Sequence, residues 1–310
     1  MNSQALAGVW NDAQVRAVTA RADHTPHALH ADHRPAPARG SLVFATLRDL
    51  PTQAYYRYLP STLNRSTPLL VSVHGISRNA REHVRACVPL AERLGCALIA
   101  PLFSREFCRG YQQLGLNGGG RRADSLLDRI VQEVASTAHL DATRINLFGF
   151  SGGAQFAHRY ALLHPQRVSR LAVASAGWYT MPDPQQHFPD GMKLYDDALA
   201  SPDVESFLAI PLLVSVGGED SGRDRHLRSE PILNARQGRT RVERAFTYVA
   251  EVSRAASLRG LPPRARLIVV AGAGHDFREC MRRGLARQVL DWFAATSPVE
   301  LPDAGSPNES

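Results

Sequence analysis

The sequence predicts an α/β protein with a mostly parallel sheet and helices on both faces. Short apolar runs recur along the chain, and several of them end in glycine, which is typical of buried strands. Longer stretches with helical periodicity lie between successive runs, and this alternation is the pattern of βαβ units. The 310 residues, 44% of them hydrophobic, are enough for one large domain or two small ones.

Each expected strand is an apolar run bounded by glycine, proline or polar residues. The first two are expected to form an antiparallel start, and the run that follows them begins the buried, parallel part of the sheet. The expected strands cover residues 41–48, 54–60, 68–75, 96–103, 144–150, 170–178, 210–220 and 265–275.

The expected helices show apolar residues at helical spacing between these strands. The clearest lies at 122–138, where the apolar positions include Leu126, Ile130 and Val134. Gly95 is expected to end the helix before it, because glycine readily adopts the left-handed conformation of a helix C-terminus. The expected helices cover residues 81–95, 122–138, 153–165, 241–260 and 279–295.

Two end segments are expected to lie outside the folded domain, which would then span residues 41–297. Residues 1–40 are rich in Ala, His and Pro and indicate a loosely ordered arm, and residues 298–310 indicate a disordered tail. Within the arm, histidines recur at every third position, but Pro26 interrupts a helix there and no acidic cluster supports a metal site. A solvated tail is the better interpretation of His24, His27, His30 and His33.

One long stretch, residues 178–209, breaks the alternation of strands and helices. It is too long for an ordinary connection, and such segments are often lids or binding loops. We expect it to form a small cap over the catalytic edge of the sheet. A second irregular stretch, residues 221–240, is rich in Arg and Gly.

Composition excludes several classes of function. The formal charge is +7, but the 36 basic residues include a single lysine, Lys193, and the arginines are scattered rather than clustered. This distribution argues against nucleic-acid binding. No apolar run approaches 18 residues, which argues against a membrane span. The N-terminal stretch lacks the pattern of a signal peptide, so a cytoplasmic protein is expected, and its oligomeric state stays open.

The four cysteines do not indicate a metal site. They include no C-x-x-C pair, so zinc binding is not expected. Free thiols are the simplest state in a reducing compartment, with a bridge between Cys108 and Cys280 as the alternative.

The sequence GFSGG, residues 149–153, places one serine between an apolar strand and a helix. It fits G-x-S-x-G, in which the serine sits on a sharp strand-to-helix turn and its hydroxyl points into a cleft. The glycines leave room for strand and helix to approach. Phosphate-binding spacings of glycine are absent here, so Ser151 is the candidate nucleophile.

A serine hydroxyl needs a base to remove its proton, and histidine is the usual one. His275 follows the last expected strand after small residues that suit a loop over the edge of the sheet. His74 also ends a strand but precedes the serine. His158 and His164 lie on the helix after Ser151, where structural or surface roles are the better interpretation. His275 is therefore the candidate base.

The carboxylate that orients the histidine is expected at another strand end. Asp220 ends the run at 210–220 and is the first candidate, because its shorter side chain lies just beyond the glycine turn, with Glu219 as the runner-up. Asp196 and Asp197, in the long insert, are a further alternative. Asp276 adjoins the histidine itself and more simply starts a local helix.

Several of these motifs resemble those of a known superfamily. From about residue 41 to 296 the chain resembles the α/β-hydrolase superfamily, on the pieces HG (74–75), GFSGG (149–153), GGED (217–220) and GH (274–275). The resemblance implies an α/β-hydrolase fold with an eight-stranded sheet, a Ser–His–acid triad in the order Ser151, Asp220, His275, and no metal or organic cofactor. It also implies oxyanion donors at the backbone N–H groups of Ile76 and Gly152, with Gly75 and Ser77 as alternatives.

Within the superfamily, the chain is loosely similar to the branch of polyhydroxybutyrate depolymerases and feruloyl esterases, on the acidic Asp124 that opens the helix before the nucleophile strand. An aspartate there is equally explained by the helix dipole.

The resulting hypothesis is a serine hydrolase that cleaves a carboxylic ester of a small molecule or an oligomer. A serine peptidase or amidase and an acyl thioesterase would use the same three residues, so substrate panels discriminate between them. A non-catalytic binding protein on this fold would usually lack one triad member, whereas here each has a candidate.

Substrate-binding residues are expected in the insert and at strand ends. Trp178, Tyr179 and Phe188, together with Met181 and Tyr195, would form an apolar wall over the cleft or else attach the insert to the body. Four arginines at strand ends would bind a substrate carboxylate, although chance placement is the better explanation in so arginine-rich a chain. They are Arg78, Arg105, Arg109 and Arg223.

Overall fold

The computed structural model describes residues 39–194, 202–222 and 226–295. The expected arm at 1–40, the tail at 298–310, and the candidates Tyr195, Asp196, Asp197 and Arg223 lie wholly or almost wholly outside these described residues. No helix in the described ranges is long and apolar enough to cross a membrane.

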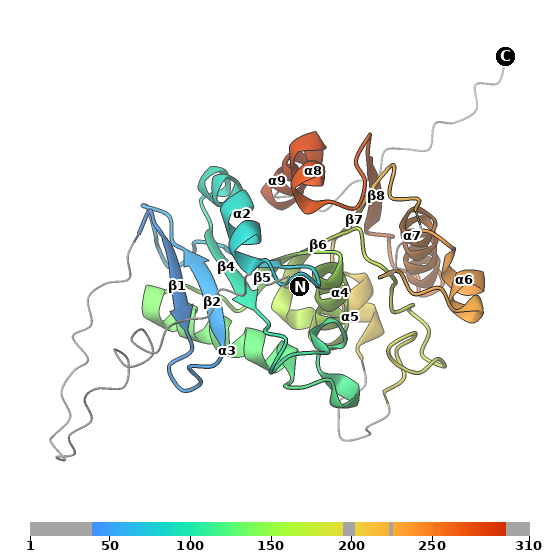
Figure 1. Cartoon of the computed structure of the whole chain (residues 1–310), viewed down its shortest axis with the longest axis horizontal. Helices are drawn as coiled ribbons and strands as arrows, with labels where there is room; N and C mark the ends of the chain where they lie inside the picture. Colours follow the sequence, from blue (N-terminus) through green and yellow to red (C-terminus); the bar gives the residue numbers. More distant parts are fainter. Residues whose placement is uncertain (1–38, 195–201, 223–225, 296–310) are drawn as a thin grey trace, which may run out of the picture. The chain divides into compact units, whose positions relative to one another are not determined.

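One eight-stranded sheet organises the described chain, in the order β1-β2-β4-β3-β5-β6-β7-β8 (Figure 1). β2 pairs antiparallel with β1 and β4, and all later pairs are parallel. The expected α/β-hydrolase sheet is thus confirmed, including its antiparallel start. The strands are β1 Leu42–Thr46, β2 Ala54–Tyr58, β3 Leu69–Val73, β4 Ala97–Leu102, β5 Ile145–Phe150, β6 Val168–Ala174, β7 Leu212–Gly217 and β8 Ala265–Val270.

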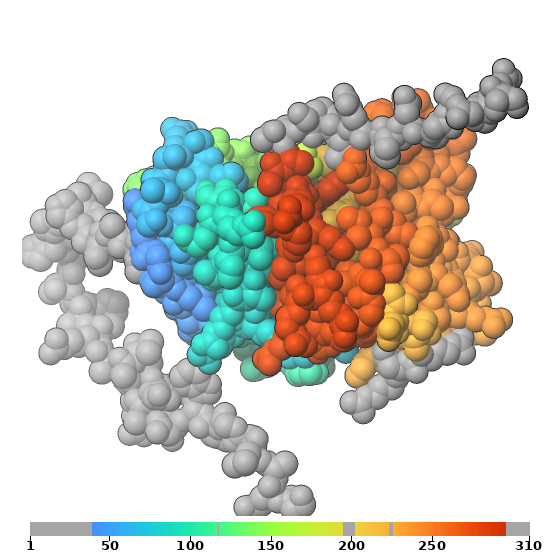
Figure 2. All heavy atoms as spheres, turned by 90° about the horizontal axis from the view of Figure 1, so that it is seen from above, coloured from blue at the N-terminus to red at the C-terminus, as the bar shows by residue number. Residues whose placement is uncertain are grey.

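Helices cover both faces of the sheet because the apolar side chains of its central strands point both ways. α2 (Ala80–Leu94) and α9 (Ala286–Ala294) pack on one face and lie side by side (Figure 2). α3 (Ala123–Ala138), α4 (Gly152–Leu163) and α7 (Arg241–Ser257) pack on the other. Gly95 ends α2 in the left-handed conformation, as expected.

The last expected helix is interrupted. α8 (Phe277–Cys280) passes through a wide turn at Met281–Leu285 before α9 begins, and Gly284 has the non-helical angles φ 124° and ψ −11°. Glycine tolerates this conformation at little cost. The helical spacing of the apolar residues did not reveal this interruption, since both helical pieces bury apolar side chains on the same face.

Among the described residues, the sequence analysis missed five short helices. Two 3-10 turns, Tyr111–Gln113 and Leu116–Gly118, lie between β4 and α3, and a third, Pro165–Arg167, follows α4. α5 (Val204–Leu208) begins after Asp203, whose side chain accepts a hydrogen bond from the Ser206 N–H. α6 (Pro231–Gln237) lies in the stretch that was expected to be irregular, and it starts with proline, which is favourable in the first turn of a helix.

The polar residues of α3 and α4 connect these two helices. Asp124 is buried and accepts hydrogen bonds from His164 at 2.9 Å and from Arg122. Burial opposes ionisation of this carboxyl, but the two donors outweigh it and lower its pKa to about 2. Asp124 therefore anchors helices, which accounts for its place at the start of α3. The four cysteines are buried free thiols, so the Cys108–Cys280 bridge is not formed.

Candidate active site

Ser151 lies at the turn from β5 into α4, on the central strand of the parallel sheet. Its backbone angles, φ 54° and ψ −113°, are uncommon for a residue with a side chain. The turn is held by a hydrogen bond of 2.8 Å from the Ser151 N–H to the Ala174 carbonyl. A Cβ on Gly149 would clash with the Gly153 carbonyl, and a Cβ on Gly153 would clash with that of Val73. The motif glycines are therefore required by close backbone approach.

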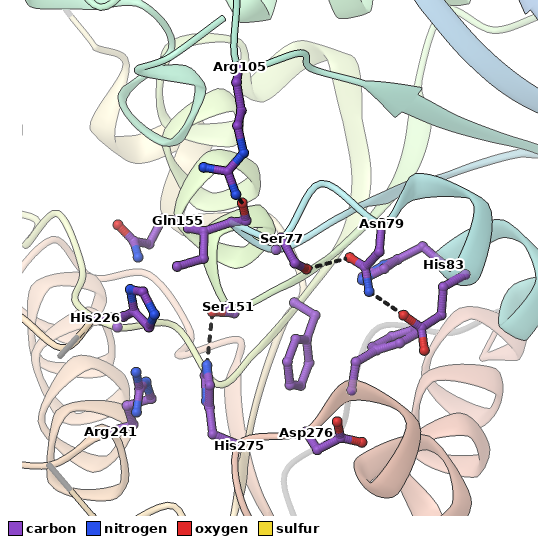
Figure 3. Close-up of a pocket in the computed structure, with 16 residues that line it drawn as sticks. Ser77, Asn79, His83, Arg105, Ser151, Gln155, His226, Arg241, His275 and Asp276 are labelled. Carbon is purple, nitrogen blue, oxygen red and sulfur yellow. Dashed lines mark hydrogen bonds between the residues drawn. The ribbon is translucent and has the colours of Figure 1, made fainter. Parts of the chain in front are cut away.

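His275 brings its imidazole to this serine from the loop after β8. Its Nε2 lies 3.0 Å from Ser151 Oγ, and its Nδ1 lies 2.7 Å from Asp220 Oδ2 (Figure 3 shows the first contact). Because a carboxylate only accepts hydrogen bonds, Nδ1 carries the proton and Nε2 is the acceptor for the serine hydroxyl. The three expected side chains therefore form one continuous chain of hydrogen bonds.

Asp220 lies in the turn that follows β7, and its side chain is 2% exposed. The competing carboxylates have other roles or lie elsewhere. Glu219 is exposed, and its N–H bonds to the Ala273 carbonyl. Asp276 caps α8 by accepting the Glu279 N–H at 2.8 Å, as its position next to the histidine suggested. Among the described carboxylates, Asp220 is the one that reaches the imidazole.

The sequence analysis missed the second partner of this carboxylate. Arg241, the first residue of α7, donates from Nη1 to Asp220 Oδ1 at 3.1 Å, and its side chain is 3% exposed. A buried carboxylate is costly unless it is paired and hydrogen-bonded. Arg241 thus compensates the charge of Asp220 and fixes its orientation toward His275. No sequence signal distinguishes this arginine from the others, since the contact depends on how α7 packs.

The loop after β3 lies against the serine turn. A Cβ on Gly75 would lie 3.5 Å from Ser151 Cβ, and the Ile76 nitrogen lies 3.2 Å from the position that a Cβ of Gly152 would occupy. Gly152 begins α4, so its N–H has no carbonyl partner within that helix. The structure therefore brings the backbones of Ile76 and Gly152 together beside Ser151.

His74 fixes this loop from inside the protein. Its Nε2 accepts the Phe103 N–H at 3.1 Å, so its Nδ1 is protonated and donates to the Gly75 carbonyl at 2.8 Å. The Tyr111 hydroxyl donates to the His74 carbonyl at 2.9 Å. Burial lowers the pKa of His74 to about 4, so the ring stays neutral at physiological pH. His74 is a structural residue of the loop.

Burial also keeps two further histidines neutral. With His74, they predict that acid destabilises the folded protein. Burial holds the pKa values of His83 and His158 well below the ordinary value. Between about pH 6.5 and 4 the unfolded chain therefore binds more protons than the folded one, and the free energy of unfolding falls as the pH drops. For His74 alone we expect a loss of about 2 kcal/mol between pH 7 and pH 5.

Urea unfolding at pH 7, 6 and 5 measures this loss above the range in which ordinary carboxylates titrate. The dependence of the free energy of unfolding on pH gives the number of protons taken up. Equal stability at pH 7 and pH 5 would show that the buried rings do not remain neutral in the folded protein.

The serine opens into a cleft of about 410 Å³. Phe150 and Phe277 form its apolar part, and the ring of His83 stacks on Phe277 at 3.8 Å. The polar lining is divided. Figure 3 shows Gln155, His226 and Arg241 on one side of Ser151, Asn79, His83 and Asp276 on the other, and Arg105 above it.

The expectation that Trp178, Tyr179 and Phe188 line this cleft is corrected by the structure. None of the three is among its lining residues. Trp178 lies between the guanidinium groups of Arg159 and Arg228, at 4.1 and 4.2 Å. Tyr179 stacks on Tyr248 of α7 at 4.1 Å. Phe188 is 1% exposed, and the centroid of its ring lies 6.0 Å from the Arg159 guanidinium carbon.

The insert that carries these aromatic residues is therefore attached to the body on the side of α4 and α7. The Thr180 N–H donates to His158 of α4, and α5 contacts both α4 and α7. None of its described residues lines the cleft, because its apolar side chains pack against these helices. His158 is satisfied by this contact and by the Ala154 carbonyl, as expected for a structural histidine.

The three described arginines at strand ends occupy different positions in the structure. Arg78 donates to the carbonyls of Phe103, Ser104, Cys108 and Arg109 and so supports a loop. Arg105 lines the cleft, whereas Arg109 does not. Among the described residues, no group of three His, Cys, Asp or Glu side chains is arranged to hold a metal ion.

Comparison with known proteins agrees with this geometry. The model of the family "Esterase PHB depolymerase" matches residues 53–181, which is under half of the chain. A poly(3-hydroxybutyrate) depolymerase from Bordetella parapertussis is 29% identical, with a TM-score of 0.64, and the match covers 81% of this chain and 86% of that one. No curated protein matches the chain.

Two other solved structures share the fold at lower identity. Poly(aspartic acid) hydrolase-1 from Sphingomonas sp. KT-1 is 24% identical, with a TM-score of 0.66 and coverage of 76% of this chain and 93% of that one. A ferulic acid esterase is 14% identical, with a TM-score of 0.52 and coverage of 82% and 96%.

The fold and the serine turn define a class of protein, the α/β hydrolases. The chain has the α/β-hydrolase fold, and its residues 53–181 are similar to the esterase family model.

Proposed function

We propose that the protein is a serine hydrolase that cleaves a carboxylic ester through an acyl-enzyme on Ser151. One observation carries the proposal, namely the continuous hydrogen bonds from Ser151 Oγ to His275 Nε2 and from His275 Nδ1 to Asp220. This arrangement allows the imidazole to take the serine proton while the carboxylate holds its tautomer and stabilises its charged form.

In the first half of the reaction, Ser151 Oγ attacks the ester carbonyl carbon as its proton moves to His275 Nε2. The C=O electron pair shifts to the oxygen, and the N–H groups of Ile76 and Gly152 would donate to it. Such donors typically contribute about 3 kcal/mol each to transition-state stabilisation. When the tetrahedral intermediate collapses, the C–O bond to the alcohol breaks and His275 gives its proton to the leaving oxygen.

In the second half, water attacks the acyl-enzyme in the same geometry. His275 takes one proton of the water, the new C–O bond forms, and the bond to Ser151 breaks as the serine recovers its proton. The products are a carboxylic acid and an alcohol. Each proton is transferred through His275, so Ser151, His275 and Asp220 are the proposed catalytic residues.

Amide and thioester hydrolysis are the alternatives, because they use the same groups. One neighbour is named as a hydrolase of poly(aspartic acid), whose backbone is an amide, and another as a depolymerase of a polyester. The ester is favoured because the family model that matches is that of an esterase, and because an alcohol leaves more readily than an amine.

A substrate panel tests the proposal. We expect hydrolysis of 4-nitrophenyl esters of short and medium acyl chains, with much lower kcat/KM for 4-nitroanilides of the same acids. Acyl thioesters of matched chain length complete the panel. A higher kcat/KM for the anilide or for the thioester than for the matched ester would assign the protein to that other reaction.

A further inference from the structure

The polar residues that line the cleft indicate a class of substrate, which the triad alone does not. Arg105 follows β4, is exposed, and lines the cleft above Ser151 in the view of Figure 3. Its Nη2 lies 3.4 Å from the Ile76 carbonyl, a long contact that leaves most of the guanidinium donors available. A cation therefore stands at the loop that carries one of the proposed oxyanion donors.

Gln155 presents further donors to the same cleft. It lies one turn after Ser151 on α4, and its Oε1 faces Arg159 Nη1 at 3.4 Å. Arg159 is itself held by the Gln112 carbonyl at 2.7 Å and by Thr180 at 2.9 Å. With its oxygen turned to this buried cation, Gln155 keeps its amide NH₂ near Gly177, which also lines the cleft.

The carboxylates that line or adjoin the cleft are engaged with other partners. Glu82 accepts from Arg278 and Asn79, Asp276 caps α8, and Asp220 lies between His275 and Arg241. Within the described ranges, no carboxylate lies within ion-pair distance of the Arg105 guanidinium. Among the described residues, its positive charge therefore has no carboxylate partner on the wall of the cleft.

We propose that Arg105 and Gln155 form a binding site for a carboxylate of the substrate, so that the preferred ester carries a free carboxylate close to the scissile bond. A guanidinium binds a carboxylate through two parallel hydrogen bonds, and an amide NH₂ adds a third donor. Arg105 contacts the carbonyl of Ile76, whose N–H is a proposed oxyanion donor, so the anion would bind on the wall of the cleft that carries this loop. The inference rests on the proposed function and names its substrate class.

Matched substrates test the inference. The 4-nitrophenyl monoester of adipic acid carries a carboxylate, and the 4-nitrophenyl ester of monomethyl adipate has the same chain without the charge. We expect the protein to prefer the anionic ester by about tenfold or more in kcat/KM, the effect of one charge-assisted contact. The preference should shrink as salt is added, because the site is exposed. Monoesters of shorter and longer diacids report the distance to the site.

Substitutions locate the site. Arg105→Gln should bring the ratio of the two kcat/KM values close to one, mainly by raising KM for the anionic ester, and Arg105→Lys should retain part of the preference. Arg109→Gln is the matched control, since that arginine is exposed on the same loop but does not line the cleft. We expect it to leave the ratio as in the unmodified protein.

A second measurement uses monomethyl adipate, which carries one free carboxylate, and dimethyl adipate, which carries none, as competitors of neutral-ester hydrolysis. Tighter inhibition by monomethyl adipate that weakens in Arg105→Gln supports the site. Equal ratios and equal inhibition in Arg105→Gln and the unmodified protein overturn it, while hydrolysis of the neutral ester leaves the proposed function standing. If neither ester is hydrolysed, the proposed function fails, and the inference fails with it.

Discussion

Replacing Ser151 by alanine should lower esterase kcat by about ten-thousand-fold or more while leaving the protein folded. Members of a catalytic triad act as a unit, so the loss of one removes most of their joint effect. The substitution deletes only the Oγ, which faces the cleft and His275, so the free energy of unfolding should change little. The activity is measured with the neutral 4-nitrophenyl ester, and folding is measured by urea unfolding.

A fluorophosphonate gives an independent readout of the same residue. It should label the unmodified protein at Ser151, identified by mass spectrometry of the labelled peptide, and should not label Ser151→Ala. Ser257→Ala, an exposed serine at the end of α7, is the control and should keep activity and labelling. An active protein that is labelled at another serine would disprove the assignment.

Replacing Asp220 by asparagine should lower kcat by about a thousandfold or more. An amide can present its NH₂ to Nδ1 and so favour the tautomer with the proton on Nε2, which cannot accept the serine proton. The change also leaves the Arg241 guanidinium facing a neutral group. Activity should therefore be expressed per folded protein, with unfolding curves recorded for each variant.

Glu219→Gln is the matched control for this prediction. It makes the same change from carboxylate to amide one residue earlier, at an exposed position whose backbone, rather than its side chain, contacts the loop of His275. We expect activity close to that of the unmodified protein. Full activity in Asp220→Asn, or loss of activity in Glu219→Gln, would assign the acid to a different residue.

Arg241 allows the role of the buried ion pair to be separated from that of the triad. Lysine at this position would keep a positive charge next to Asp220, whereas methionine would remove it at similar length. A buried carboxylate that loses its cation is strongly destabilising. The contact with Asp220 Oδ1 at 3.1 Å therefore makes this arginine as much a part of the fold as of the site.

The sequence determined the features that depend on local chemistry. The turn at Ser151 needs small residues at 149 and 153 because backbone atoms approach there, and this requirement is visible as a motif. Alternating apolar runs and amphipathic stretches predicted all eight strands and most helices, because central strands are buried on both faces and the main helices on one. Asp220 and His275 could be named because parallel strands deliver their following loops to one edge of the sheet.

Tertiary structure decided what depends on packing between distant segments. Arg241 reaches Asp220 only because α7 packs beside β7, and the sequence contains many arginines that do not. Trp178, Tyr179 and Phe188 could equally have lined a cleft or joined a core, since burial of an aromatic ring is favourable in either place. Trp178 and Tyr179 are part of the core because Arg159 and Tyr248 stack on their rings there.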